Sequence, residues 1–118
     1  MVEIYGIKNC DTMKKAFVWL DENGVAYNFH DYKKEGADRA VIAKALEQLG
    51  MDSVINRRGT AWRGLPDDLK AAAEQDNGKA LALALENPSV IKRPLLVTDN
   101  GDMHTGFKPD TYSTILKK

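Results

Sequence analysis

The turn that organises this chain reads Tyr5-Gly6-Ile7-Lys8-Asn9-Cys10-Asp11-Thr12-Met13-Lys14-Lys15. It follows a short apolar run, Val2 to Tyr5, which predicts a first strand. It precedes apolar residues at i, i+3, i+4 and i+7, the spacing of an amphipathic helix. These residues are Met13, Ala16, Phe17 and Leu20. Cys10 is therefore expected in a strand-to-helix turn, with Asp11 or Thr12 as the N-cap of the helix.

Cys10 is the only cysteine in the chain and the obvious candidate nucleophile. A lone cysteine is more often a small buried hydrophobic residue. Here the polar neighbours argue against a core position, and the turn after a first strand is where α/β folds place their chemistry. Unpaired backbone N–H groups at a helix start, with positive charge from Lys8, Lys14 and Lys15, favour a thiolate. We therefore predict that Cys10 is reactive and titrates below the free-thiol reference of about 8.5.

Length and composition indicate one compact domain of 118 residues, 43% of them hydrophobic. Because 17 Lys and Arg residues balance 17 Asp and Glu residues, bulk charge gives no reason to expect binding to nucleic acid or membrane. A single cysteine excludes a disulfide-stapled secreted module. No apolar run approaches the roughly 20 residues of a membrane span, and the chain opens on a strand rather than a signal peptide. We expect a cytoplasmic monomer.

The remaining periodicities predict strands towards both ends of the chain and helices between them. A helix from about Thr12 to Asn23 and a strand from Val25 to Tyr32 complete a parallel βαβ unit. A polar connection at residues 33–36 leads into a helical insertion at about residues 37–90. Its expected helices cover residues 38–49, 66–74 and 79–86, with a break at Asp76-Asn77-Gly78 before the last of them. Strands at 94–98 and 102–105, joined by the turn Asp99-Asn100-Gly101, precede a helix from Pro109.

Arginines supply the second group of candidate site residues. The segment Asn56 to Arg63 holds Arg57, Arg58 and Arg63, and Arg93 precedes Pro94 at the entrance to the third strand. Arginine forks suit carboxylates and oxyanions, although a solvated basic loop would look the same. Trp62 either packs on the helical insertion or contacts nucleic acid, and the balanced charge disfavours the second.

Metal and nucleotide chemistry are not indicated. His30 and His104 lie far apart and are expected as partly buried strand residues, so there is no zinc motif. The glycines form neither a dinucleotide-binding nor a Walker pattern, which predicts no nucleotide cofactor.

Taken together, the chain resembles the arsenate reductase family, in the branch that includes the Spx-type transcription regulators, and most closely the YffB-like subgroup. The resemblance covers essentially the whole chain. It is carried by the motifs Tyr5 to Thr12, Asn56 to Arg63, Arg93 to Val97 and Gly106-Phe107. It implies a thioredoxin-like fold with a mixed sheet, in which the helical insertion separates a βαβ half from a ββα half. It also implies a cis peptide bond before Pro94.

The resemblance implies a glutathione-dependent thiol oxidoreductase with Cys10 as its single nucleophile. Glutathione would be the co-substrate and glutaredoxin a partner protein. The residues that would bind substrate or glutathione are Asn9, Thr12, Arg57, Arg58, Arg63, Arg93 and Pro94. The arsenate enzymes usually have Cys-Gly-Thr-Ser-Arg where this chain has Cys10-Asp11-Thr12-Met13-Lys14, which puts arsenate in doubt as a substrate. Met13 also removes the Cys-x-x-Cys switch of the Spx regulators. The alternative is a regulator that docks on RNA polymerase without that switch.

Overall fold

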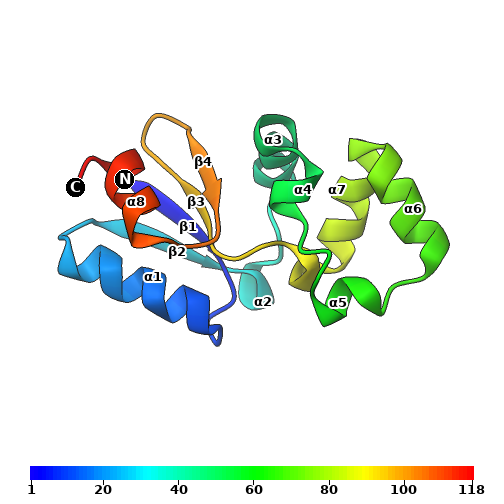
Figure 1. The fold of residues 1–118 in the computed structure, drawn as a ribbon, viewed down its shortest axis with the longest axis horizontal. Coiled ribbons are helices and arrows are strands. Elements are labelled where there is room, and N and C mark those ends of the chain that lie inside the picture. Colours follow the sequence, from blue (N-terminus) through cyan, green and yellow to red (C-terminus); the bar gives the residue numbers. More distant parts are fainter. The chain divides into compact units, whose positions relative to one another are not determined.

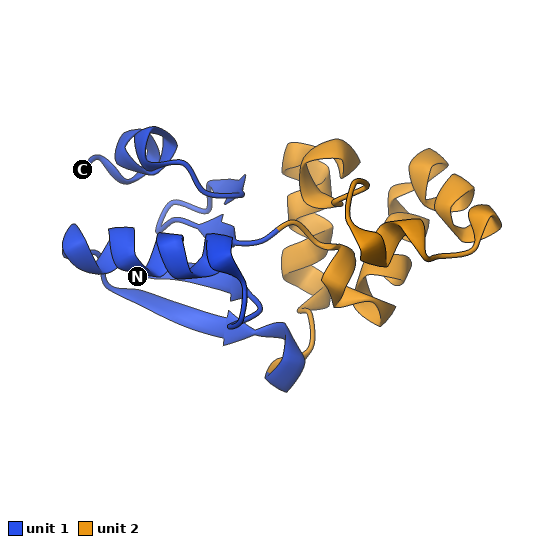
Figure 2. Cartoon of the chain, turned by 60° about the horizontal axis from the view of Figure 1, so that its bottom comes forward, with its two compact units in different colours: residues 1–34, 93–118 blue, residues 35–92 orange.

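The computed structural model describes residues 1–118, which divide into two compact units (Figure 2). Unit 1 comprises residues 1–34 and 93–118 and so joins both ends of the chain. Unit 2 comprises residues 35–92 and contains the helices placed by the sequence at about 37–90. No helix has the length and the apolar character needed to cross a membrane.

Unit 1 is built on a four-stranded mixed sheet (Figure 1). Its strands are β1 (Val2–Gly6), β2 (Tyr27–Asp31), β3 (Leu95–Val97) and β4 (Met103–Thr105), in the spatial order β2-β1-β3-β4. β1 is parallel to β2 and antiparallel to β3, and β3 is antiparallel to β4. Helix α1 (Asp11–Glu22) connects β1 to β2, and α8 (Pro109–Leu116) follows β4. The predicted thioredoxin-like order of a βαβ half and a ββα half is confirmed.

Helices α1 and α8 pack on the same face of the sheet. The strands alternate, so that Val2, Ile4 and Leu96 point to this face, where they meet residues spaced three or four apart on α1. The fully or almost fully buried members of this core are Val2, Ile4, Met13, Ala16, Leu20, Leu96 and Tyr112. Phe17 extends the core by stacking on Tyr27 with a centroid distance of 5.5 Å. The helix containing Cys10 at its start is thus fixed to the sheet by apolar packing.

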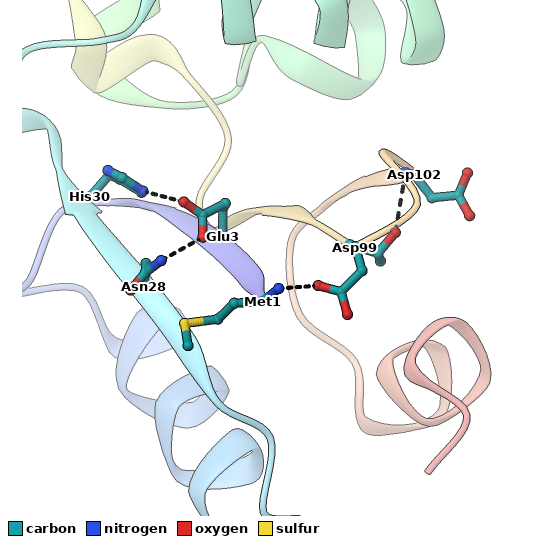
Figure 3. Close-up of polar contacts among 7 residues, drawn as sticks. Met1, Glu3, Asn28, His30, Asp99 and Asp102 are labelled. Carbon is teal, nitrogen blue, oxygen red and sulfur yellow. Dashed lines mark hydrogen bonds and ion pairs between the residues drawn. The ribbon is translucent and has the colours of Figure 1, made fainter.

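The other face of β1 and β2 carries polar side chains (Figure 3). Glu3 accepts from Asn28 Nδ2 at 2.9 Å, and its other carboxylate oxygen lies 3.0 Å from His30 Nε2. The His30 ring stacks on Tyr5 with a centroid distance of 4.5 Å. His30 and His104 are both partly buried strand residues, as predicted.

Unit 2 is almost entirely helical. Its elements are α3 (Arg39–Leu49), α4 (Met51–Val54), α5 (Thr60–Arg63), α6 (Asp67–Gln75), α7 (Asn77–Glu86) and the 3-10 helix η1 (Pro88–Val90). An isolated bridge pairs Ile55 with Ile91. Trp62 is only 5% exposed and belongs to the core of this unit. Of the two interpretations of Trp62, packing is therefore the one confirmed.

Three local predictions were wrong. α1 begins at Asp11 with Cys10 at the N-cap position, because the helical hydrogen bonds already start with Lys14 N donating to Cys10 O at 3.0 Å. The polar connection after β2 is a short helix, α2 (Tyr32–Glu35), which starts where Lys33 N donates to Asp31 Oδ1 at 2.9 Å. The expected break at residues 76–78 is confined to Asp76, whose carboxylate caps the first turn of α7.

Candidate active site around Cys10

Cys10 lies where the turn after β1 enters α1. Its backbone is extended, with φ −131° and ψ 130°, and the next residue is the first of the helix. The side chain is half-buried and packs against the edge of the unit 1 core, while Lys8, Asn9 and Asp11 around it are exposed. The thiol is thus held in place on one side and accessible on the other, as a nucleophile requires.

The surroundings of Cys10 favour its thiolate. Burial raises the pKa of the thiol and is the largest single influence, but several opposing influences together outweigh it. They are the backbone N–H of Met13, the side chain of Arg93, the backbone N–H of Thr12 and the charge of Arg93. The neutral thiol makes no hydrogen bond of conventional geometry with the helix start, so these N–H groups act mainly on the charged form. The net result is a pKa of Cys10 below its ordinary value, the direction predicted.

The cation responsible for this shift differs from the one expected. Lys8, Lys14 and Lys15 are exposed and are not among the groups that lower the pKa of Cys10, whereas Arg93 is. The reason is topological, because antiparallel pairing places Leu95 at the start of β3 opposite Tyr5 near the end of β1. Arg93, two residues before Leu95, therefore comes to the same edge of the sheet as the turn that holds Cys10.

Pro94 fixes the chain beside Arg93. The peptide bond between Arg93 and Pro94 is cis, which confirms the prediction drawn from the resemblance. The Pro94 carbonyl accepts from Gly106 N at 2.9 Å, beyond the end of β4. The segment that enters β3 is thus tied to the chain just beyond β4, which fixes the backbone next to Arg93.

Tyr32 is a residue of this edge that the sequence did not single out. It follows β2 directly and is only 4% exposed. Burial raises the pKa of its phenol, the nearby Tyr5 adds to that rise, and the charge of Arg93 opposes it. Tyr32 was expected as the last residue of a strand, and no local signal marks it as a neighbour of Arg93. Its position follows from β2 running parallel to β1.

The other two candidate residues of the Cys10 turn are Asn9 and Thr12. Asn9 is exposed, and Thr12 acts on Cys10 through its backbone N–H rather than through its hydroxyl. Cys10, Asn9, Thr12, Arg93 and Pro94 all belong to unit 1.

The remaining three candidate arginines belong to unit 2, where two of them share a pocket of about 510 Å³. Arg57 and Arg58 line this pocket together with Asp52, Ile55, Asn56 and Lys92. Arg57 is paired with Asp52 and lies 3.8 Å from Glu74, so its charge is largely neutralised. Arg58 is exposed and engages Asn56 only through its backbone N–H, at 3.3 Å. Arg63, at the end of α5, does not line the pocket.

Metal-binding residues are not grouped anywhere in the structure. No three His, Cys, Asp or Glu side chains are arranged so that they could hold a metal ion.

Comparison with known proteins finds relatives along the whole chain. The sequence pattern of the ArsC family matches residues 5–115. A solved structure described as a YFFB protein has a TM-score of 0.88 at 48% identity and covers 97% of both chains. An arsenate reductase (ArsC) related protein from Brucella melitensis has a TM-score of 0.72 at 46% identity, covering 99% of this chain and 95% of that one. The global transcriptional regulator Spx of Streptococcus mutans is 26% identical over 120 residues, covering 100% of this chain and 85% of the regulator.

Proposed function

The chain belongs to the ArsC family, and we propose that it is a glutathione-dependent thiol oxidoreductase whose single nucleophile is Cys10. The observation that carries the proposal is the thiolate-favouring environment of Cys10 at the start of α1. Two backbone N–H groups and Arg93 together outweigh burial and lower the pKa of the thiol. A structural cysteine would need no such environment, whereas a nucleophile depends on its thiolate form.

The proposed reaction is thiol–disulfide exchange. The Cys10 thiolate attacks one sulfur of a substrate disulfide, forms a mixed disulfide with it, and releases the other sulfur as a thiolate. A further thiol, from glutathione or glutaredoxin, then releases Cys10 by the same exchange. Arsenate is not the substrate we favour, because the exposed carboxylate of Asp11 next to the nucleophile would repel a highly charged oxyanion.

Glutathione binding is assigned to the groups beside Cys10. Pro94 has no N–H and its carbonyl is already bonded to Gly106, so a strand-like pairing with the glutathione main chain would use the backbone of Arg93. The Arg93 guanidinium would hold one carboxylate of glutathione. Within the pocket of unit 2, Arg58 is a better candidate than Arg57 for binding an anion, since Arg57 is paired with Asp52. Asn9, Thr12 and Arg63 stay predictions as binding residues.

Intact-mass measurement tests the nucleophile. Incubation with glutathione disulfide should add one glutathione to the wild-type protein and none to Cys10→Ser. The rate of addition should follow the thiolate fraction measured by ultraviolet absorbance. If no adduct forms on the wild-type protein while a free model thiol reacts under the same conditions, the oxidoreductase proposal is wrong.

Calorimetry in the Cys10→Ser background tests the binding site, because covalent capture is then prevented. A charge-assisted hydrogen bond contributes about 1.5–3 kcal/mol, so Arg93→Ala should weaken glutathione binding by roughly tenfold to a hundredfold. Lys118→Ala removes an exposed positive charge at the opposite edge of unit 1 and should leave the affinity unchanged. If Arg93→Ala and Arg58→Ala both bind glutathione with the same affinity as the Cys10→Ser protein, neither arginine holds the anion and the site is elsewhere.

The second candidate function is a regulator that docks on RNA polymerase. It is supported by the similarity to the Streptococcus mutans regulator, which extends over this entire chain. Met13 is fully buried in the unit 1 core and cannot form a disulfide with Cys10, so such a regulator would act without that switch. Purified RNA polymerase should then bind the protein equally well with Cys10 or with Cys10→Ser. If no binding is measurable by either form, this candidate is excluded.

A further inference from the structure

Positive charge collects at one edge of the sheet in unit 1. β1, β2 and β4 all run towards this edge and β3 starts from it, as their parallel and antiparallel pairing requires. The segments that follow β1, β2 and β4 therefore meet there, and so do the first turns of α1 and α8. They carry six exposed lysines, namely Lys8, Lys14, Lys15, Lys33, Lys34 and Lys108. We call this region, with Cys10 and Arg93, the Cys10 edge.

The charge of unit 1 is separated between its two edges. At the Cys10 edge, six lysines and Arg93 lie with four carboxylates, those of Asp11, Asp31, Asp110 and Glu35 at the end of α2, a side-chain balance of 7 − 4 = +3. At the opposite edge lie the end of α1, the turn between β3 and β4, and the end of α8. The charged side chains there are Asp21, Glu22, Asp99, Asp102, Lys117 and Lys118, a balance of 2 − 4 = −2. Figure 3 shows two of these carboxylates on the β3–β4 turn, Asp99 being paired with the Met1 ammonium group at 2.5 Å.

The lysines of the Cys10 edge are not neutralised within the protein. None of the six forms an ion pair, whereas Lys70 in unit 2 is paired with Asp67 at 3.3 Å. α1 and α8 both begin at this edge, so the positive ends of their dipoles add to the same field. Exposed charges of this kind contribute little to tight binding, but their summed field attracts and orients a charged partner.

The spread of these lysines indicates a large partner. The segments after β2 and β4 are separated by three interstrand spacings, or about 14 Å. A single small anion cannot contact lysines on both, but an acidic protein surface can. Nucleic acid is also a polyanion, yet it offers no sulfur atom to the thiol at the centre of this edge.

We propose that the Cys10 edge is a docking surface for an acidic protein that carries the disulfide on which Cys10 acts. This proposal rests on the proposed function, since it takes Cys10 to be a reactive thiol. The Cys10 thiolate would attack one sulfur of the partner's disulfide, forming a mixed disulfide and releasing the other sulfur as a thiolate. The positive field would raise the rate of encounter with an acidic partner and not with a neutral one.

Two synthetic peptides of equal length serve as probes, each with one cysteine activated as a 2-thiopyridyl disulfide. The cysteine is flanked by glutamates in one peptide and by glutamines in the other. The absorbance of released pyridine-2-thione gives a second-order rate constant for each peptide. The readout is the ratio of the glutamate-peptide constant to the glutamine-peptide constant, because this ratio cancels the intrinsic reactivity of Cys10. In the wild-type protein we expect a ratio of about 10 at low ionic strength, where the Debye length is about 30 Å, falling towards 1 at about 1 M salt.

A pair of matched double variants tests the location of the surface. Lys33→Glu with Lys34→Glu reverses two exposed charges at the Cys10 edge and keeps the Lys33 backbone N–H that bonds to Asp31. Lys117→Glu with Lys118→Glu makes the same charge change at the opposite edge. The first double variant should bring the ratio close to 1 at low salt, and the second should leave it near the wild-type value.

Three results would overturn the proposed docking surface. They differ in whether the proposed oxidoreductase function also fails. A ratio near 1 in the wild-type protein, with both peptides reacting faster than with a free model thiol, overturns the docking surface and leaves the oxidoreductase standing. Absence of any such rate advantage with either peptide overturns the proposed function as well. A single-stranded oligonucleotide that binds more tightly than the glutamate peptide of equal charge would assign the surface to nucleic acid instead.

Discussion

Replacing Gly6 by alanine would test how closely the core of unit 1 controls the Cys10 site. A Cβ atom at Gly6 would lie 2.5 Å from Met13 Sδ and 2.9 Å from Met13 Cε, whereas ordinary contact begins at 3.4 Å. Met13 must therefore move by about 3.4 − 2.5 = 0.9 Å. Its side chain is fully buried between the sheet and α1, so there is no open space to receive it.

We expect Gly6→Ala to lower the free energy of unfolding by about 1–3 kcal/mol, the usual cost of overpacking a core. The backbone N–H of Met13 is also one of the groups that favour the Cys10 thiolate. If the start of α1 moves to relieve the contact, the pKa of Cys10 should rise towards its ordinary value. Urea unfolding measures the first effect, and thiolate absorbance against pH measures the second.

A double-mutant cycle with Met13→Ala identifies the contact. Met13→Ala removes Sδ and Cε and should by itself cost about 2–5 kcal/mol. In that background Gly6→Ala should cost much less than in the wild-type protein, because the new Cβ meets no sulfur. Gly64→Ala is the control, since its Cβ would make only an ordinary 3.4 Å contact with Thr60 O, and we expect little change. An equal cost of Gly6→Ala in both backgrounds would refute the reasoning.

Three further predictions concern stability. Asp38 caps α3 by accepting from Val41 N at 3.2 Å. Asp38→Ala should therefore lower the free energy of unfolding, measured by urea titration, by about 1 kcal/mol. Asp38→Asn keeps a capping oxygen and should retain most of the wild-type stability. The pKa of Cys10 is lowered in the folded protein, so between that pKa and the unfolded value the unfolded chain binds more protons. Wild-type stability relative to Cys10→Ser should therefore increase as pH rises through this interval, and a pH-independent difference would contradict the shift. The buried hydroxyl of Tyr112 has no hydrogen-bond partner in the protein. Tyr112→Phe should therefore leave the free energy of unfolding unchanged or raise it by about 1 kcal/mol. A clear loss of stability would mean that the hydroxyl is hydrogen-bonded.

Much of the fold follows from the sequence, because it depends on local patterns. The apolar run of β1, the helical spacing from Met13 to Leu20 and the turn at Asp99-Asn100-Gly101 each specify an element without reference to distant residues. The place of Cys10 between a strand and a helix follows from two of these patterns. The cis bond before Pro94 was predictable only from the family resemblance, since nothing in its immediate neighbours requires it.

The chemistry of the site depends on which strands become neighbours, and local sequence contains no such information. The lysines beside Cys10 in the sequence point into solvent, and the cation that lowers its pKa is Arg93, brought near by the antiparallel pairing of β1 with β3. Tyr32 reaches Arg93 because β2 is parallel to β1.

The same distinction holds for charge. The amino-acid sequence alone determines a net charge of zero, which gives no reason to expect binding to nucleic acid or membrane. The tertiary structure separates that charge, because the strand directions bring the lysine-bearing segments after β1, β2 and β4 to a single edge. Electric fields depend on where charges lie and not on their sum, so only the folded chain could reveal this surface.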